Sequence, residues 1–273
     1  MELRLPRRTV CLEGPIVIGI VNATPDSFSD GGRFQGARAA IEHGIALSQE
    51  GAAIVDVGGE STRSGAVAVE IDVELRRVLP VIAALDARGI IVSVDTRHAV
   101  VAEQAVQHGA SIIDDVSGLR DPAMCAVAAH YRVPVVIMHM PIDNPATMQQ
   151  HAQYDDVVAD VAAFLQRQVA TARAAGVSQV IIDPGIGFGK TADHNLELIR
   201  RLDEIVALGH PVMVGASRKR FIGTITGAAE PDTRLVGTLV AHLAALDGGA
   251  TILRVHDVAA HIQTVRMWSA LHQ

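Results

Sequence analysis

The residues best suited to chemistry in this chain stand at the ends of short apolar runs. The run 180–182 is followed by the carboxylate of Asp183, by Pro184, which ends strand hydrogen bonding, and by three glycines before Lys190. A P-loop needs glycine where Pro184 stands, and a dinucleotide fingerprint needs its third glycine one residue beyond Gly189, so neither motif is matched. We predict a carboxylate at a buried strand end beside a glycine-rich rim; a structural turn with a capping aspartate is the alternative.

Polar residues occupy the same place after the other apolar runs. Those residues are Asn22, Asp56, Asp95, Asp114, Asp115, His139, Ser217, Arg254 and His256. A charged group at a buried strand end is unfavourable unless it is paired or used, so this recurrence predicts a site. Ends of parallel strands meet at one face of a barrel, where ligands bind.

Eight apolar runs, separated by helical stretches, must position these residues. They lie near residues 16–22, 53–58, 90–95, 111–116, 133–139, 179–183, 211–217 and 250–255. Nearly all lack alternation, which indicates strands buried on both faces, as in a parallel sheet. Glycines end the predicted helices, as left-handed caps do, at Gly51, Gly89, Gly109, Gly176 and Gly249. We predict one domain over residues 1–273, an α/β (β/α)8 TIM barrel with a short N-terminal β-hairpin; a doubly wound open sheet is the alternative.

Composition narrows the class of protein. The chain has 273 residues, of which 49% are apolar, enough for a sizeable core. Its net charge of −7 argues against general nucleic-acid binding. Two distant cysteines, Cys11 and Cys125, fit a reducing compartment. Neither a signal-peptide pattern nor an apolar run of membrane-spanning length is found, so we expect a cytoplasmic protein without a membrane partner.

Seven segments carry a specific resemblance. In order they read NATPDSFSDGG at 22–32, GGESTRSG at 58–65, SVDT at 93–96, DDVSG at 114–118, DPGIGFGK at 183–190, SRK at 217–219 and RVHD at 254–257. Together they resemble the pattern of the dihydropteroate synthases of folate biosynthesis. The resemblance implies condensation of a 7,8-dihydropterin bearing a CH₂-diphosphate with p-aminobenzoate, giving dihydropteroate and pyrophosphate. It also implies Mg²⁺, a homodimer, and sulfonamides as mimics of aminobenzoate.

The resemblance and the chemistry of the substrates together assign roles. Carboxylates accept the N–H donors of a pterin edge, whereas the diphosphate needs cations or aimed N–H groups. The predicted pterin set is Asp95, Asp114, Asp183, Lys219, Met138, Val116, Phe188 and Gly215. The diphosphate set is Asn22, Thr62, Arg63, Arg254 and His256, with Asn22 the single protein ligand of Mg²⁺. The aminobenzoate set is Thr62, Ser64, Phe188, Ser217 and Lys219, and the catalytic residues are Arg63, Lys219, Arg254 and His256.

Two departures from the family pattern stand out. Asp114 replaces the usual Asn and places a third acid near Asp95 and Asp183, so either its pKa is raised or a cation lies close. Ser64 replaces the usual Pro in a loop expected to touch aminobenzoate. Two other functions stay open: transfer of a methyl group from methyltetrahydrofolate to a corrinoid, and pterin binding without catalysis. The intact loop residues Asn22 and Arg63 disfavour both.

Overall fold

A computed structural model describes residues 2–6, 9–11, 14–24, 33–61, 69–142 and 146–272; the side chains of residues 11 and 33–35 are excepted. The predicted site residues Thr62, Arg63 and Ser64 lie outside the described residues. The same holds for residues 25–32 of the motif at 22–32.

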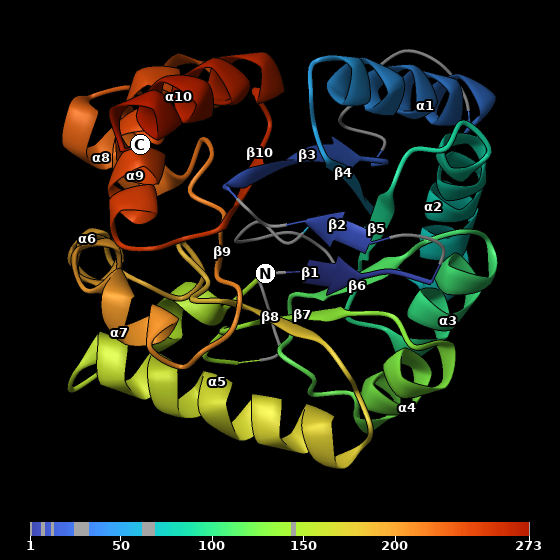
Figure 1. The fold of residues 1–273 in the computed structure, drawn as a ribbon, viewed down its shortest axis with the longest axis horizontal. Helices are drawn as coiled ribbons and strands as arrows, with labels where there is room; N and C mark the ends of the chain where they lie inside the picture. The colour runs from blue at the N-terminus through green and yellow to red at the C-terminus, as the bar shows by residue number, and fades with distance from the viewer. Residues whose placement is uncertain are drawn as a thin grey trace.

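Parallel strands form a ring in the middle of the described part of the molecule (Figure 1). They are β3 (Ile16–Asn22), β4 (Ile54–Gly58), β5 (Val92–Asp95), β6 (Ile112–Asp115), β7 (Val135–Met138), β8 (Val180–Asp183), β9 (Met213–Val214) and β10 (Ile252–Val255). Their order is β8-β7-β6-β5-β4-β3-β10-β9, and a parallel bridge between Ile182 and Val212 links the two ends. The Ile182 N–H donates to the Pro211 carbonyl at 3.0 Å. The barrel prediction is therefore confirmed, and an open doubly wound sheet is excluded.

Helices cover the outside of the ring (Figure 1). They are α1 (Arg33–Gln49), α2 (Ile71–Asp86), α3 (Ala99–Gln107), α4 (Pro122–Tyr131), α5 (Val157–Ala174), α6 (Ala192–Arg200), α7 (Leu202–Val206), α8 (Arg220–Thr226), α9 (Leu235–Asp247) and α10 (Val258–Leu271). All five predicted cap glycines adopt positive φ, from 75° at Gly89 to 115° at Gly109, a region that glycine enters without a Cβ penalty.

The strands are buried on both faces because each face packs against a different apolar layer. In β7, Val135 and Ile137 belong to the large core shared with the helices, whereas Val136 points into the barrel. Alternate residues of a strand point to opposite sides, which explains why the buried runs show no polar alternation. The lower barrel interior is lined by Ile18, Ile54, Ile91, Ile112, Val136, Ile181, Met213 and Ile252.

The predicted N-terminal hairpin closes this lower end of the barrel. Its strands β1 (Glu2–Arg4) and β2 (Thr9–Cys11) are antiparallel. Leu3 and Leu5 are buried in the same cluster as the lower interior residues, and the Arg4 N–H donates to Gln179 Oε1 at 2.7 Å. The hairpin prediction is confirmed, and the mouth opposite the hairpin is left for polar residues. Within the described residues, no helix is both long and apolar enough to cross a lipid bilayer.

Candidate active site

Polar side chains form the upper layer of the barrel interior. Asp56, Asp114, Asp183 and Arg254 each lie two residues beyond an isoleucine of the lower layer, on the same strand. Because side chains two apart along a strand share a face, these four project toward the barrel axis near its C-terminal mouth. The expectation that strand-end polar residues converge is met for these four strands.

Arg254 lies at the centre of this layer. Its Nε and Nη2 are 2.8 Å and 2.5 Å from Asp56 Oδ2, and its Nη2 is 2.6 Å from Asp95 Oδ2. Its Nε also lies 3.3 Å from Asp114 Oδ2. Arg254 was predicted to contact the diphosphate; in the structure it belongs to β10 and reaches inward to three carboxylates.

Burial shapes the charge of these acids. Burial raises the pKa of Asp95 to about 7 although Arg254 opposes the shift, and it raises the pKa of Asp114 well above its usual range. Burial also opposes the charge on Arg254, but Asp56, Asp95 and Asp114 outweigh it and raise its pKa. Both outcomes expected at Asp114, a raised pKa and a nearby cation, are therefore present.

One oxygen atom of the acidic cluster makes no hydrogen bond to the described residues. Asp114 Oδ1 is buried and has no hydrogen-bond partner among the residues that the structure describes. A buried acceptor without a partner is destabilising by about 1–3 kcal/mol. The upper layer thus keeps a free acceptor at the mouth, which suits a ligand that brings N–H donors.

Asp115, the neighbour of Asp114, faces the other way. Its carboxylate accepts hydrogen bonds from the backbone N–H groups of Ser117 and Leu119, at 2.8 Å and 2.9 Å. Leu119 has φ of +62°, so Asp115 supports a strained turn after β6. Because adjacent residues of a strand point to opposite sides, Asp115 supports the turn whereas Asp114 faces the mouth.

Asp183 ends β8 beside Lys219 and Phe188. Its Oδ1 accepts from the Gly185 N–H at 2.6 Å, and burial raises the pKa of Asp183 against the influence of that bond and Lys219. Lys219 Nζ lies 3.9 Å from the centre of the Phe188 ring, a cation–π distance. Three residues from the predicted pterin set are thus brought together.

The glycines after Asp183 serve the turn itself. A Cβ on Gly185 would lie 1.9 Å from the His139 carbonyl, and one on Gly187 would lie 2.8 Å from Lys219 Cδ. Both glycines adopt positive φ. The two interpretations of this loop therefore combine: Asp183 both supports the turn and faces the mouth.

Lys190 fills the inside of this turn and was missed as a structural element. Its Nζ donates to the carbonyls of Gly185 and Phe188 at 2.9 Å and 3.0 Å, and it lies 3.0 Å from His139 Nδ1. Burial lowers the pKa of Lys190 to about 7 and that of His139 to about 2. His139 is consequently a neutral acceptor tied to the loop.

The predicted apolar wall exists as a separate small cluster. Val116, Met138 and Phe188 are buried together with Met140 and Met148. This cluster lies apart from the two barrel cores and follows the ends of β6, β7 and β8. The structure brings the three predicted residues together, and their contact with a ligand stays a prediction.

The side of the mouth formed by β9 and β10 carries Gly215, Ser217 and His256. A Cβ on Gly215 would meet only Arg254 atoms at 3.8 Å or more, so the space above it is open. Ser217 Oγ lies 3.0 Å from His256 Nδ1 and accepts from the His256 backbone N–H at 3.1 Å. Burial, followed by the charges of Arg218 and Arg254, lowers the pKa of His256 to about 3. His256 is therefore neutral at pH 7.

Asn22 ends β3 in register with Gly58 of β4 and is half-buried. One amide oxygen at a strand end suits a hard cation that takes most of its remaining ligands from water and phosphate. Asn22 is thus brought to the same end of the barrel as the acids.

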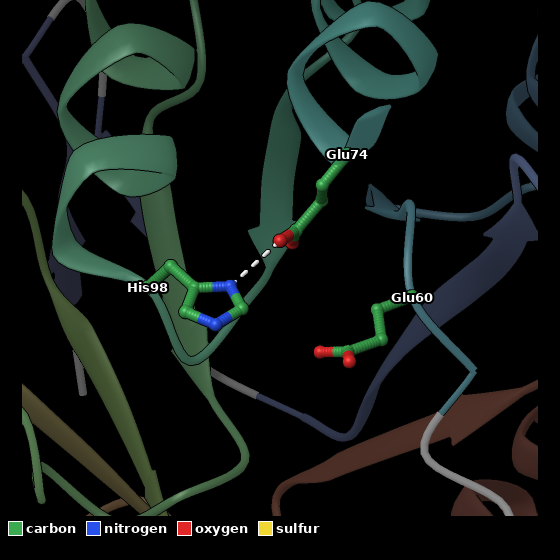
Figure 2. Close-up of side chains that lie close together, drawn as sticks. All are labelled: Glu60, Glu74 and His98. Carbon is green, nitrogen blue, oxygen red and sulfur yellow. Dashed lines mark hydrogen bonds and ion pairs between the residues drawn. The ribbon is translucent and has the colours of Figure 1, made fainter. Parts of the chain in front are cut away.

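A second group of acids lies beside the ends of β4 and β5 (Figure 2). His98 Nδ1 is 2.8 Å from Glu74 Oε2, and the bond to Glu74 raises the pKa of His98. Glu60 is paired with Arg97 at 3.0 Å and accepts from the Val69 N–H at 3.1 Å. Glu60 joins Arg97 to Val69, and Glu74 on α2 joins His98, so we interpret this group as contacts between the segments that follow β4 and β5 and α2. Glu74 Oε1 is buried without a hydrogen-bond partner among the described residues.

The sequence placed Asp56 at a strand end but assigned it to no substrate, although it is the main partner of Arg254. Its other oxygen accepts from Ser93 Oγ at 2.5 Å, and Asp56 is buried. The signal that could have found it is its spacing, since it stands two residues after Ile54 as Asp114 stands after Ile112.

Comparison with known proteins decides the family. The family described as "Pterin binding enzyme" matches residues 18–256. A dihydropteroate synthase of Mycobacterium leprae is 47% identical, over 93% of this chain and 92% of the relative. The chain belongs to the dihydropteroate synthase family. A dihydropteroate synthase of Thermus thermophilus in complex with 4-aminobenzoate superposes with a TM-score of 0.91 at 49% identity, covering 99% of this chain and 100% of that chain.

A second Thermus thermophilus dihydropteroate synthase structure, in complex with 6HMPPP, superposes with a TM-score of 0.89 at 46% identity, covering 100% of both chains. Dihydropteroate synthases are transferases of folate biosynthesis, and this chain shares their fold and their sequence over nearly its whole length. The corrinoid methyltransferase and the non-catalytic binder are therefore set aside.

Proposed function

We propose that this chain joins the methylene carbon of 7,8-dihydropterin-6-ylmethyl diphosphate to the amine of p-aminobenzoate. The observation that carries the proposal is the acidic upper layer, in which Asp114 Oδ1 is buried without a partner among the described residues while Arg254 lies beside Asp114 and Asp95. A pterin edge offers several N–H donors in one plane, and carboxylates accept such donors in pairs.

We infer that the pterin edge binds Asp95, Asp114 and Asp183, with Lys219 donating to its carbonyl or ring nitrogen. In that state the pterin donors replace Arg254 at Asp95 and Asp114. Asp56 keeps the guanidinium, since it makes two of its short contacts. Val116, Met138 and Phe188 then face the ring, and Gly215 leaves room for it.

The diphosphate is assigned to Thr62, Arg63, Arg254 and His256. His256 is neutral, so it contributes an N–H donor rather than a charge. We infer that Asn22 supplies the protein oxygen for Mg²⁺, which offsets charge on the diphosphate when it is bound. The C–O bond breaks first, pyrophosphate leaves with the electron pair, and the dihydropterin spreads the positive charge of the methylene carbon.

The amine attacks that carbon from a pocket assigned to Thr62, Ser64, Phe188, Ser217 and Lys219. An aromatic amine is already neutral at pH 7, so its lone pair forms the C–N bond and its proton leaves to water without a strong general base. Sulfonamides, which mimic aminobenzoate, are proposed inhibitors at the same pocket. We propose a cytoplasmic setting, which the two widely separated cysteines support.

We also propose a homodimer formed through the late helices. Large apolar side chains are exposed on α8, α9 and α10, which are neighbours in the fold (Figure 1). They are Ile225, Val236, Val240, Met267 and Leu271. Exposed apolar side chains on neighbouring helices are typical of an interaction surface. The double substitution Val236→Asp with Val240→Asp should yield a monomer in sedimentation, whereas Val100→Asp on α3 should not.

Amine-dependent release of pyrophosphate tests the reaction. The protein, the pterin diphosphate and Mg²⁺ should release pyrophosphate only when p-aminobenzoate is added. Arg63→Ala should reduce turnover far more than it weakens binding of a free pterin without diphosphate. Pyrophosphate release that does not depend on p-aminobenzoate would contradict the proposed reaction. An equal loss of turnover and of free-pterin affinity in Arg63→Ala would contradict the role given to Arg63.

A further inference from the structure

Two histidines form a buried contact between α9 and α10, away from the acidic cluster. His242 and His261 are both fully buried, and His242 Nδ1 lies 2.9 Å from His261 Nε2. At one end, the Ala216 backbone N–H donates to His242 Nε2 at 3.0 Å. At the other end, His261 Nδ1 lies 2.6 Å from the Asp257 carbonyl oxygen. The two rings therefore join Ala216 to Asp257 through the core.

The end groups allow one arrangement of protons in this chain of bonds. A backbone N–H can only donate, so His242 Nε2 must accept and its proton must sit on Nδ1. That proton is donated to His261 Nε2, which leaves the proton of His261 on Nδ1. The Asp257 carbonyl can only accept, so the last bond is also satisfied. Both rings are thus neutral Nδ1–H tautomers, and burial lowers the pKa of each.

The two ends of this relay lie directly beside the site. Ala216 directly precedes Ser217, and Asp257 directly follows His256. Ser217 Oγ and His256 Nδ1 lie 3.0 Å apart on the mouth side. Arg218 strengthens the same junction, since its Nε and Nη2 lie 3.0 Å and 2.6 Å from the Asp257 carboxylate. The segments after β9 and β10 are therefore joined by three connections: Ser217 with His256, Arg218 with Asp257, and the relay through the core.

The segment held by the relay is locally strained. Arg218 adopts φ of +58°, a conformation that a side chain with a Cβ seldom takes. Its N–H donates to Thr238 Oγ1 at 3.1 Å, and Thr238 lies one helical turn before His242 on α9. Two adjacent turns of α9 thus hold two backbone N–H groups of one strained turn, which carries Ser217 and Lys219.

We propose that His242 and His261 are positioning residues that hold Ser217 and Lys219 in register with His256 for the reaction with aminobenzoate. This inference rests on the proposed function, in which these three residues contact the substrates. Apolar side chains could fill the same volume, but they would leave the Ala216 N–H and the Asp257 carbonyl without these partners in the core.

The first test is spectroscopic and needs no substrate. Long-range ¹H–¹⁵N correlation spectra of the intact protein should assign the Nδ1–H tautomer to both rings. This is the less common tautomer of a free imidazole, so its presence at both positions would identify the relay. An Nε2–H tautomer or a charged ring at either position would overturn the proposal.

The second test separates positioning from packing. His242→Leu introduces an apolar side chain of similar size and removes the hydrogen bonds to the Ala216 N–H and to His261. It should raise KM for p-aminobenzoate by about tenfold, the effect of losing roughly one buried hydrogen bond. His242→Gln, which retains an acceptor for the Ala216 N–H, should recover most of that loss. Free-pterin affinity should fall by less than KM rises in both variants, because Asp95, Asp114 and Asp183 also bind the pterin and the relay holds only Lys219 of that set.

Leu246→Ala is the matched control, because Leu246 is buried one turn further along α9 and lies outside the relay. It should lower the melting temperature and leave KM for p-aminobenzoate unchanged. If His242→Leu lowers the melting temperature as Leu246→Ala does and leaves KM unchanged, the histidines are packing residues. If the wild-type protein lacks amine-dependent pyrophosphate release, the proposed function itself fails, and the tautomer spectra still report on the relay.

Discussion

The lower and upper layers of the barrel interior are built by the same strands, yet they differ completely in chemistry. Asp56 lies two positions after Ile54 on β4, and Asp183 lies two positions after Ile181 on β8. The lower layer is apolar and is sealed by the N-terminal hairpin. The upper layer holds buried charges around Arg254 and one acceptor, Asp114 Oδ1, that has no partner in the described part of the chain. The lower layer stabilises the barrel, whereas the buried charges of the upper layer lower the stability of the fold and provide groups that can bind a ligand.

The largest expected effect belongs to the upper layer. Asp183→Ala should reduce affinity for a free pterin by about a thousandfold, because it leaves two or more N–H donors of the ligand unpaired in a buried site. The melting temperature should change little, since the substitution also removes a buried charge. Isothermal titration calorimetry with a free pterin measures the first and calorimetric unfolding the second. Unchanged affinity would refute the role given to Asp183.

The matched substitution in the lower layer should have the opposite result. Ile181→Ala creates a cavity among fully buried side chains and should lower the free energy of unfolding by about 2–5 kcal/mol. Pterin affinity at low temperature should stay within about threefold of wild type, because the acids above keep their strand. Urea unfolding measures the loss. A protein equally stable without Ile181 would remove the distinction between the two layers.

A smaller effect should appear at Asp114 as a dependence on pH. Its pKa is raised in the folded protein, first by burial and then by Asp56, so its contribution to stability is present at low pH and is lost as pH rises. Asp114→Asn removes this titration. The free energy of unfolding of the variant, relative to that of wild type, should rise by an amount on the order of 1 kcal/mol as pH increases above about 4, the usual pKa of an unfolded aspartate. Parallel stability curves for the two proteins would contradict the raised pKa.

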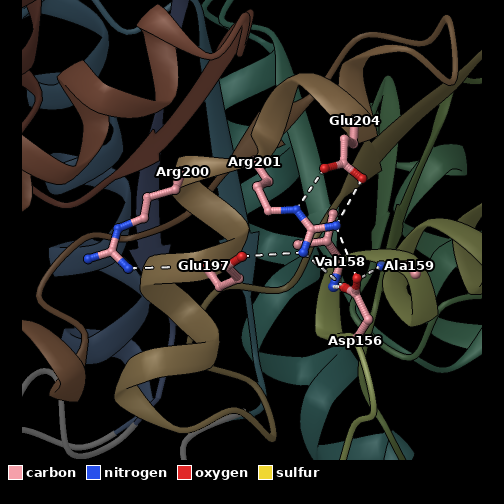
Figure 3. Close-up of polar contacts among 7 residues, drawn as sticks. All are labelled: Asp156, Val158, Ala159, Glu197, Arg200, Arg201 and Glu204. Carbon is pink, nitrogen blue, oxygen red and sulfur yellow. Dashed lines mark hydrogen bonds and ion pairs between the residues drawn. The ribbon is translucent and has the colours of Figure 1, made fainter.

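The smallest effect is expected at a surface network that has no counterpart in either layer (Figure 3). Arg201 pairs with Glu204 at 2.7 Å and with Asp156 at 3.1 Å. The two acids are solvent-exposed and Arg201 is partly exposed, so screening weakens the pairs. Arg201→Ala should therefore leave the melting temperature within about 1 °C of wild type. Asp156→Ala should lower it further, because Asp156 also caps α5 by accepting from Val158 and Ala159. Equal changes in melting temperature for the two variants would mean that the ion pairs contribute more than the helix cap.

Local patterns predicted most of the scaffold. The eight apolar runs became the eight parallel strands, and the glycines after the helices became left-handed caps. The wall residues Val116, Met138 and Phe188 also gather as expected. Such features depend on neighbours in the chain, where strand periodicity and cap geometry act over a few residues.

Partners across the barrel were predicted less well. Arg254 was predicted to contact the diphosphate, yet it reaches Asp56, which is 198 residues away in sequence. The relay through His242 and His261 was likewise not predicted, since no local pattern in the sequence links the two helices that carry them. A side chain's position in a strand or helix sets its direction, but its partner depends on what the other elements bring to that place.

The sequence by itself determined the barrel, the layer at which polar residues enter it and, through seven ordered motifs, the family. The tertiary structure alone decided which acid meets which base and which carboxylate oxygen is left for a ligand. The physical reason is range. Propensity and alternation act along the chain, whereas hydrogen bonding and burial depend on atoms that only the closed ring brings within 3 Å of one another.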